Sequence, residues 1–400
     1  MTKKYGIIVF SLVVCLFLAT GCGGSGKKQE TQSTAQSSAG EIKIGVIAPL
    51  SGPPIGWGYA VQHGAELAAD EVNEKGGLEI GGKKYKIKVV AYDDLYTGQG
   101  GVAAINRLVF EDKIKLIIGP ISSASLLAIQ GITEPNKVIL MADTYTTKAL
   151  SKDKQYTFRV VPTTAEFSKP MIAWLAKTYP DAKKVCILSP KDETGTEVQD
   201  HNTKAYEAAG MNIVFKDFYE RDVKDFVPYL SRAFSKSPDI LELDGSSPGT
   251  CGLIMKQARQ LGFKGIIIKT GGPGAQETIK VAGNENAEGW IYYTPYDPNE
   301  PTVKAFIEKY SKKYKDPMNG LTPYFFDGTK MLFKAMQDAN DFTDTEKIKA
   351  KIEQIRDFPG LLGKINWSGS ETYGINHQII TPSYVCQFKN GKETVVSKLD

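Results

Sequence analysis

Short apolar runs alternate with longer amphipathic segments along most of the chain. The first run, 42–50, is rich in β-branched residues and ends at the polar turn 51–54, as is typical of a buried strand. Residues 59–75 then carry apolar side chains at helical spacing, and this segment stops at Gly76-Gly77. We expect further strands at 85–92, 114–119 and 138–142 and helices at 99–112 and from 123. The alternation predicts a parallel sheet with helices on both faces.

The same alternation restarts at 157–161 and runs to residue 270. We expect strands at 184–189, 211–218, 240–244 and 265–270, with helices at 164–178, 195–209, 223–236 and 250–261. The last third differs, since three long helices, at 302–314, 323–339 and 343–355, lie between expected strands at 290–295 and 376–388. A chain that returns after two separate series indicates an α/β protein with two lobes built from discontinuous segments. Ligands of such sheets bind at the carboxyl ends of the strands.

The first 41 residues have a different pattern. Lys3 and Lys4 precede an apolar stretch at 7–20 that ends in Thr20-Gly21-Cys22, as in a secretory signal with a lipoprotein cleavage box. The alternative, a transmembrane anchor, would need roughly 20 apolar residues. We therefore expect a signal peptide at 1–21, a lipid on Cys22, and a flexible polar tether at 22–41. This predicts an extracytoplasmic protein anchored to the cell membrane, in a periplasm or on the outer face of the plasma membrane.

Charge and cysteine content exclude several classes of protein. The net charge of +4 falls by two, to +2, when Lys3 and Lys4 leave with the signal, and no basic block is present, so we expect no nucleic-acid partner. Beyond the signal and Cys22, the cysteines are Cys186, Cys251 and Cys386. Their wide spacing fits neither a disulfide framework nor a zinc site, and the sequence does not select a pair that would form a bridge.

The sequence contains no recognisable catalytic constellation. Its three histidines, His63, His201 and His377, lie outside any metal-binding or triad motif, and His63 is expected at the surface. Gly-rich stretches at 98–101 and 271–274 lack the spacing of a phosphate-binding loop. We therefore expect a protein that is not an enzyme and that needs no cofactor or metal.

Several short motifs are informative because of their order along the chain. They are Gly-Val-Ile-Ala-Pro-Leu-Ser-Gly-Pro at 45–53, Asn-Glu-Lys-Gly-Gly at 73–77, Tyr-Asp-Asp at 92–94, Ile-Gly-Pro-Ile-Ser-Ser at 118–123, Lys-Asp-Phe at 224–226, Gln-Ala-Arg-Gln-Leu-Gly at 257–262 and Ala-Glu-Gly at 287–289. Together they resemble type I periplasmic binding proteins of the branched-chain amino-acid group, over about residues 42–390. The resemblance implies two Rossmann-like lobes with parallel sheets, joined by three crossover segments, that close on a ligand. We expect an N-terminal lobe at 42–160 plus 295–368 and a C-terminal lobe at 161–294 plus 369–400.

The resemblance also implies a set of ligand-binding positions. The positions are Trp57, Ser122, Ser123, Thr144, Tyr145, Thr146, Thr194, Ser246 and Gly271. Trp57 falls where the family often has an aromatic side chain over the ligand, while Ser123 and Thr146 fall where hydroxyl and backbone groups hold a carboxylate. Ser123 also opens an expected helix, whose N-terminus favours an anion. The alternative for Ser123 and Thr146 is simple capping of a helix and a turn, and for Trp57 it is packing.

Three of these positions depart from the amino-acid binders. Thr194 and Ser246 stand where aromatic residues are common, and Gly271 stands where the family has an acidic residue that grips the ligand's ammonium group. A buried ammonium needs a carboxylate or several acceptors. Asp244 or Asp143 could substitute, although neither is at the family's position. The departures favour an aromatic or other organic acid over a leucine-type amino acid.

These observations predict a solute-binding lipoprotein that serves an ABC importer of the branched-chain amino-acid type. Its partners would be a small carboxylate-bearing molecule, the ABC permease subunits and, through the lipid, the membrane, and we expect a monomer. A sensory protein that docks to a receptor or histidine kinase is the alternative, because it would share the fold and the cleft. An envelope enzyme on the same scaffold is a third possibility, and the missing nucleophile and metal set argue against it.

Overall fold

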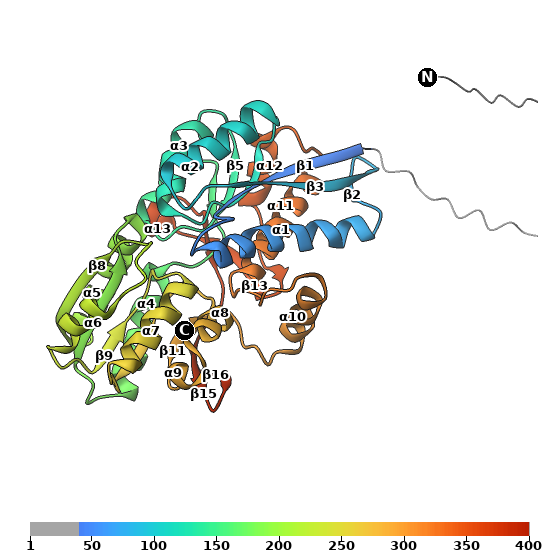
Figure 1. The fold of residues 1–400 in the computed structure, drawn as a ribbon. Coiled ribbons are helices and arrows are strands. Elements are labelled where there is room, and N and C mark those ends of the chain that lie inside the picture. The colour runs from blue at the N-terminus through green and yellow to red at the C-terminus, as the bar shows by residue number, and fades with distance from the viewer. Residues whose placement is uncertain (1–39, 400) are drawn as a thin grey trace, which may run out of the picture. The chain divides into compact units, whose positions relative to one another are not determined.

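Two β-sheets organise the chain in the computed structural model, which describes residues 40–399 (Figure 1). The first sheet has nine strands in the order β12-β13-β14-β6-β5-β4-β1-β3-β2. These are β1 (Gly40–Ala48), β2 (Leu78–Ile80), β3 (Lys83–Asp93), β4 (Leu116–Ile118), β5 (Ile139–Ala142), β6 (Thr157–Arg159), β12 (Phe358–Gly360), β13 (Gly363–Ser368) and β14 (Gln378–Ile380). The pairings from β3 through β1, β4, β5 and β6 to β14 are parallel, and β2, β12 and β13 pair antiparallel at the edges.

The second sheet has seven strands in the order β16-β15-β11-β10-β9-β7-β8. They are β7 (Lys184–Pro190), β8 (Asn212–Tyr219), β9 (Ile240–Glu242), β10 (Ile266–Lys269), β11 (Ile291–Thr294), β15 (Ser383–Lys389) and β16 (Lys392–Leu399). The first five in sequence pair parallel, and the hairpin β15–β16 joins β11 antiparallel. The predicted α/β class is confirmed, with the difference that both sheets are mixed at their edges.

Helices follow most of the parallel strands and cover the sheets (Figure 1). Those associated with the first sheet are α1 (Ile55–Glu74), α2 (Gly98–Asn106) with the π-helical turn η1 (Arg107–Glu111), α3 (Ser123–Thr133), the 3₁₀ turn η2 (Thr147–Ala149), α10 (Pro301–Lys313), α11 (Thr322–Ala339), α12 (Thr345–Glu353) and α13 (Ser370–Tyr373). Those along the second series are α4 (Thr164–Thr178), α5 (Glu193–Ala208), α6 (Val227–Phe234), α7 (Pro248–Gln260), α8 (Ala275–Ala282) and α9 (Asn284–Ala287).

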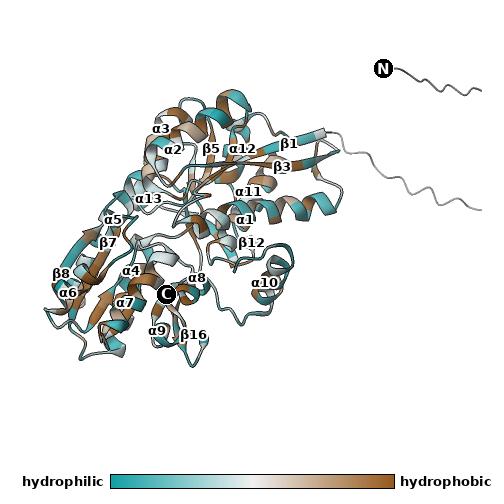
Figure 2. Cartoon of the chain, viewed as in Figure 1, coloured by the Kyte–Doolittle hydropathy of each residue, from teal (hydrophilic) through white to brown (hydrophobic). Residues whose placement is uncertain are grey.

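Both faces of each sheet are buried, which explains the continuous apolar runs in the sequence. On β1, Ile44 and Val46 belong to one apolar cluster, whereas Ile47 belongs to another on the opposite face. On β7, Leu188 and Ile187 divide between two clusters in the same way. Figure 2 shows apolar residues on the strands and polar residues on the outer faces of the helices. Helices on both faces thus bury strands that lack a polar side.

Three details differ from the sequence predictions or complete them. Helix α1 begins at Ile55, so Trp57 lies in its first turn and not in a loop. The expectation that His63 is at the surface is wrong, because its ring stacks on Tyr314 at 3.6 Å between centroids and its Nδ1 lies 2.8 Å from the Tyr310 hydroxyl. The three cysteines within 40–399 are free and buried, namely Cys186, Cys251 and Cys386.

The chain passes between the two sheets three times, as expected for three crossover segments. The passages lie between β6 and β7, between β11 and β12, and between β14 and β15. The proposed lobe boundaries stay a prediction. Because β14 pairs with β6, we propose that the last passage follows Ile380, rather than residue 368.

The predicted signal peptide, Cys22 and most of the tether lie outside the described residues. Among residues 40–399, no helix is both long enough and apolar enough to cross a membrane. The same residues hold no group of three or more His, Cys, Asp or Glu side chains arranged to bind a metal ion.

Candidate ligand-binding site

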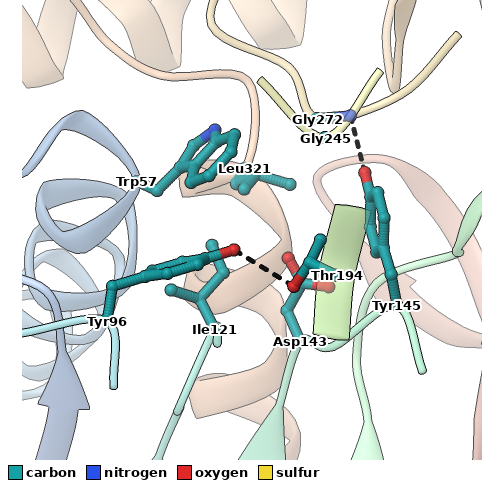
Figure 3. A pocket seen from close by; sticks show the side chains of 9 residues that line it. All are labelled: Trp57, Tyr96, Ile121, Asp143, Tyr145, Thr194, Gly245, Gly272 and Leu321. Atoms are coloured by element: carbon teal, nitrogen blue, oxygen red, sulfur yellow. Dashed lines mark hydrogen bonds between the residues drawn. The ribbon is translucent and has the colours of Figure 1, made fainter. Parts of the chain in front are cut away.

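A cavity, with about 310 Å³ of atom-free space that includes the open solvent at its mouth, is lined by residues that adjoin both sheets (Figure 3). The first sheet and its helices contribute Trp57, Tyr96, Ile121, Asp143, Tyr145 and Leu321, and the second contributes Thr194, Gly245 and Gly272. Seven of these nine residues lie within four residues of the carboxyl end of a strand, which is where parallel α/β sheets hold ligands.

Trp57 reaches the cavity because α1 starts very close to the end of β1. A Cβ atom at Gly58 would lie 1.8 Å from the carbonyl oxygen of Pro49, so only glycine permits this approach. The indole of Trp57 is 4% exposed, and its Nε1 donates to the carbonyl oxygen of Pro273 at 3.2 Å. Trp57 thus spans from the first sheet to the loop after β10 of the second.

Tyr96 forms another wall of the cavity from a strained turn. Leu95 and Tyr96 both have a left-handed backbone, with φ of 53° and 59°. Asp94 supports this turn, since its Oδ1 accepts the hydrogen bond of the Tyr96 N–H at 2.9 Å. Non-glycine residues with positive φ are uncommon and concentrate at functional sites. The Tyr96 ring lies 5.8 Å from that of Trp57 between centroids, which gives the cavity two adjacent aromatic sides.

A chain of hydroxyl groups joins the two sheets beside the cavity. Thr194 Oγ1 lies 3.4 Å from the Tyr96 hydroxyl and donates to Ser123 Oγ at 3.2 Å. Ser123 Oγ also accepts the hydrogen bond of the Thr146 N–H at 3.3 Å. Two positions selected by the sequence resemblance, Thr146 and Thr194, therefore both donate to the third, Ser123.

The capping interpretation holds for Thr146 but not for Ser123. Ser122, and not Ser123, caps α3, because its Oγ accepts from the Ser125 N–H at 3.3 Å. Thr146 Oγ1 caps η2 by accepting from the Lys148 N–H, while the Thr146 N–H remains directed at Ser123. Capping and ligand contact are thus compatible at Thr146, since they use different atoms.

Arg159 fixes the loop that carries these groups. Its guanidinium is 1% exposed, and its Nη1 donates to the carbonyl oxygens of Thr144 and Thr146 at 3.3 and 3.1 Å. Its Nε donates to Gln378 on β14. Arg159 thereby ties the loop after β5 to a strand from the far end of the sequence.

The nine residues predicted from the sequence fall into two sets. Trp57, Tyr145 and Thr194 line the cavity, whereas Ser122, Ser123, Thr144, Thr146, Ser246 and Gly271 do not. Ser246 Oγ accepts a hydrogen bond from the Tyr219 hydroxyl at 2.7 Å. At Gly271, a Cβ atom would lie 2.5 Å from Phe167 Cζ and 3.0 Å from Asp244 Oδ1, so no space remains there for a side chain. A role in ligand binding stays a prediction for all nine.

Within residues 40–399, Asp143 is the one carboxylate that lines the cavity. It is 2% exposed, and its Oδ1 is buried with no hydrogen-bond partner among residues 40–399. Burial raises the pKa of Asp143 to about 8, and the nearby Arg159 partly opposes this shift. The sequence suggested Asp143 only as a substitute acid, because its place in the cavity depends on the spatial order of the strands.

Two cations that the sequence analysis missed lie next to the aromatic walls. The Arg221 guanidinium lies 4.5 Å from the centroid of Tyr96, pairs with Asp192 and donates to the carbonyl oxygen of Gly245 at 3.2 Å. Lys269 Nζ lies 5.4 Å from the centroid of Trp57 and donates to the carbonyl oxygen of Gly272. Burial lowers the pKa of Lys269. The remaining missed residues are Tyr96, Ile121, Gly245, Gly272 and Leu321.

Comparison with known proteins places this arrangement in a family. A family model described as periplasmic binding protein matches residues 41–393. The Leu/Ile/Val-binding protein BraC3 of Rhizobium johnstonii is 27% identical over 347 residues, which cover 86% of this chain and 90% of that protein.

Solved structures give the same result. The leucine binding protein LivK of Thermotoga maritima superposes with a TM-score of 0.78 at 27% identity, covering 90% of this chain and 99% of that one. A solute binding protein of an ABC transporter from R. palustris, solved in complex with benzoate, has the same fold, with a TM-score of 0.77 at 18% identity and coverage of 90% and 96%. The resemblance seen in the sequence is thus confirmed, and the chain belongs to the periplasmic binding protein family, in the branched-chain amino-acid group with the type I fold.

Proposed function

We propose that the protein is an extracytoplasmic solute-binding lipoprotein that captures a small carboxylate-bearing molecule and delivers it to an ABC importer of the branched-chain amino-acid type. The ligand would be an amino acid or an aromatic or other organic acid. The observation that carries the proposal is a cavity whose walls come from both sheets, in a chain of this family. Relatives are named for leucine, isoleucine and valine, and the benzoate complex indicates that the fold also admits an aromatic acid.

Donor groups beside the cavity support a carboxylate as the recognised group. The Thr146 N–H and the Thr194 hydroxyl both donate to Ser123 Oγ, and Thr194 Oγ1 also lies 3.4 Å from the Tyr96 hydroxyl. A ligand carboxylate that accepts from these three donors would replace neutral hydrogen bonds with charge-assisted ones, which are about twice as strong. Trp57 and Tyr145 would then cover the rest of the ligand.

Closure of two lobes on the ligand is the expected mechanism. Direct hydrogen bonds already join the two sides, from the Gly272 N–H to the Tyr145 hydroxyl at 2.6 Å and from the Thr147 N–H to Glu197 Oε1 at 3.0 Å. A ligand that contacts both sides favours the closed form by its differential affinity for the two forms. This mechanism requires no chemical step, in keeping with a binding protein that is not an enzyme.

A thermal-shift screen of residues 23–400, after unfolding and refolding to remove carried-over ligand, tests the proposal. The panel contains aliphatic amino acids, aromatic carboxylates, short fatty acids, amides and polyamines. A ligand at 100 times its dissociation constant adds about 2.7 kcal/mol and raises the midpoint. Stabilisation by a carboxylate-bearing compound supports the proposal, and stabilisation only by amides or polyamines contradicts it.

A sensory protein that docks to a receptor or histidine kinase is the second candidate, because it would use the same fold and cavity. Reconstitution separates the two functions. Ligand-loaded protein should stimulate ATP hydrolysis by its ABC permease complex in proteoliposomes, with the lipid on Cys22 retained. Labelling with a radioactive lipid precursor tests the anchor, and a Cys22→Ser variant should lose the label.

A further inference from the structure

Asp143 presents an unusual combination of burial and missing partners. The carboxyl group follows β5 directly, and its backbone N–H is held by the carbonyl oxygen of Pro120 at 3.0 Å. The side chain lines the cavity (Figure 3), and Oδ1 has no hydrogen-bond partner within residues 40–399. An ionised carboxylate is disfavoured when it is buried without a partner. A cationic donor supplied by a ligand would favour the ionised form.

The charged and titratable groups around Asp143 do not supply that donor. Arg159 on β6 is the cation that acts on it, but its Nη1 and Nε donate to Thr144, Thr146 and Gln378. Its Nη2 makes no hydrogen bond within residues 40–399 and lies 3.7 Å from Glu166 Oε1, so none of its N–H groups bonds Asp143. The other titratable groups that interact electrostatically with Asp143 are phenols, namely those of Tyr96, Tyr145, Tyr293 and Tyr324. Burial raises the pKa of all four, so they stay neutral and cannot balance a carboxylate. Because its pKa is about 8, the Asp143 carboxyl group carries a proton at neutral pH.

The aromatic walls restrict where a positive charge can lie. Aromatic faces attract ammonium groups. However, Arg221 already lies over Tyr96 and Lys269 lies near Trp57, at 4.5 and 5.4 Å from the ring centroids. A cationic group of a ligand is therefore repelled from the side of these two cations and attracted to the side of Asp143. With the two cations on one side and Asp143 on the other, the cavity suits a ligand that carries an anionic group as well as a cationic one.

We propose that Asp143 is the specificity-determining residue of this cavity and that it pairs with an ammonium group of the ligand. The ligand then carries an amine as well as a carboxylate. This inference deepens the proposed function and rests on it. It replaces the sequence-based preference for an amine-free acid.

The geometry at Gly271 explains why the acid has this position. The acidic residue that the family has there cannot be accommodated, since even a Cβ atom would lie 2.5 Å from Phe167 Cζ. Asp143 supplies a carboxylate from the first sheet instead of the second. The binding of a cation then expels the proton from Asp143, so that ligand uptake releases a proton into solution.

Matched pairs of compounds test the inference in wild type and in Asp143→Asn. The pairs are L-leucine with 4-methylpentanoate and L-phenylalanine with 3-phenylpropanoate, each measured by calorimetry. In wild type we expect the amine-bearing member of a pair to bind at least 100-fold more tightly than its partner. In the variant, this preference should fall at least 10-fold, while the affinity for the amine-free member stays within about threefold, which also shows that the variant is folded.

Proton release gives a readout that a merely structural role would not move. Calorimetry at pH 7 in phosphate and in Tris, whose ionisation enthalpies differ, should report close to one proton released by wild type and none by Asp143→Asn. Glu242→Gln is the matched control. Glu242 is also fully buried with a pKa raised to about 8, but it does not line the cavity and bonds the Tyr206 hydroxyl at 2.7 Å. On binding the ligand, the Glu242→Gln variant should release as many protons as wild type does.

The outcomes separate this inference from the function on which it rests. If no member of either pair and no other carboxylate binds wild type, the proposed function fails. If amine-free acids bind wild type as tightly as their amine-bearing partners, or if Asp143→Asn keeps the preference and the proton release, the function stands and the role of Asp143 is refuted.

Discussion

The hydroxyl of Tyr145 accepts a hydrogen bond from the backbone N–H of Gly272 at 2.6 Å. Tyr145 follows β5 of the first sheet and Gly272 follows β10 of the second, so one bond joins loops of the two sheets. Gly272 has φ of +66°, and a Cβ atom there would lie 3.3 Å from the Trp57 ring. A glycine thus allows this backbone to approach both Tyr145 and Trp57.

Tyr145→Phe is expected to weaken ligand binding by about 5- to 150-fold. The substitution leaves the buried N–H of Gly272 without a partner, which costs about 1–3 kcal/mol. The cost arises only where the two loops meet, so it opposes closure. Calorimetric titration with the ligand found by thermal shift measures the effect. Tyr92→Phe, which removes a hydroxyl bonded to Asp112 away from the cavity, is the control and should bind like wild type. Equal affinity of both variants would contradict a role in closure.

Substitution of Gly271 is expected to destabilise the protein without creating a new binding group. In Gly271→Ala the added Cβ would lie 2.5 Å from Phe167 Cζ, which forces a shift of that ring and costs about 1–3 kcal/mol. Gly271→Glu should destabilise the protein further, because it adds a carboxylate beside the buried Asp244. Urea denaturation measures both.

Gly249→Ala in α7 is the matched control, since no atom lies within 4 Å of the added Cβ. Its stability should equal that of wild type or exceed it by up to about 1 kcal/mol, because alanine favours a helix over glycine. A stable Gly271→Glu variant with tighter binding of amines would mean that this loop moves, and that the acid can act from the family's usual position.

Most helices and strands could be predicted because each combined a regular spacing of apolar residues with capping or turn residues at its ends. The helix expected at 164–178 is found at Thr164–Thr178, where Thr163 and Glu166 form a capping box. The misses have physical reasons. Strand β16 has the sequence Lys-Glu-Thr-Val-Val-Ser-Lys-Leu and lies at an edge of its sheet, so charged and polar residues leave it without an apolar run. The start of α1 was placed four residues too late, because Gly56 and Gly58 indicate a loop unless the contact with Pro49 is known.

The cavity could be predicted only in part. Trp57, Tyr145 and Thr194 were selected through the family resemblance, and all three line it. Tyr96 and Leu321 were missed because they lie in loops far apart in the sequence and meet only after the sheet has formed. Arg221 has no sequence signal, since its cation–π contact with Tyr96 links the two sheets.

Arg221→Gln is expected to lower ligand affinity by about tenfold. The change removes an ion pair with Asp192 and the charge that lies 4.5 Å from the centroid of Tyr96, and contacts of this kind contribute about 0.5–2 kcal/mol where they are shielded from water. Arg221→Lys should recover only part of the loss, because an ammonium lacks the planar fork that also donates to Gly245. Stopped-flow measurement of ligand dissociation should show the effect as faster release. An unchanged dissociation rate in both variants would exclude Arg221 from the closed state.

The unliganded protein should become less stable as the pH rises from about 4 to 8, and Asp143 should account for much of this loss. The pKa of Asp143 is about 8 in the folded chain, well above that of an unfolded aspartate, so the folded state binds more protons in this range and stability falls with rising pH. Asp143→Asn cannot ionise and lacks this dependence. The stability of the variant minus that of wild type should therefore be several kcal/mol larger at pH 8 than at pH 4, because each pKa unit corresponds to about 1.36 kcal/mol. Urea denaturation at the two pH values measures the gain. If wild type and the variant differ in stability by the same amount at both pH values, the Asp143 carboxyl group is not in the environment described. If an amine-bearing ligand removes the variant's gain in stability at pH 8, the lower stability of wild type is linked to the binding of an amine.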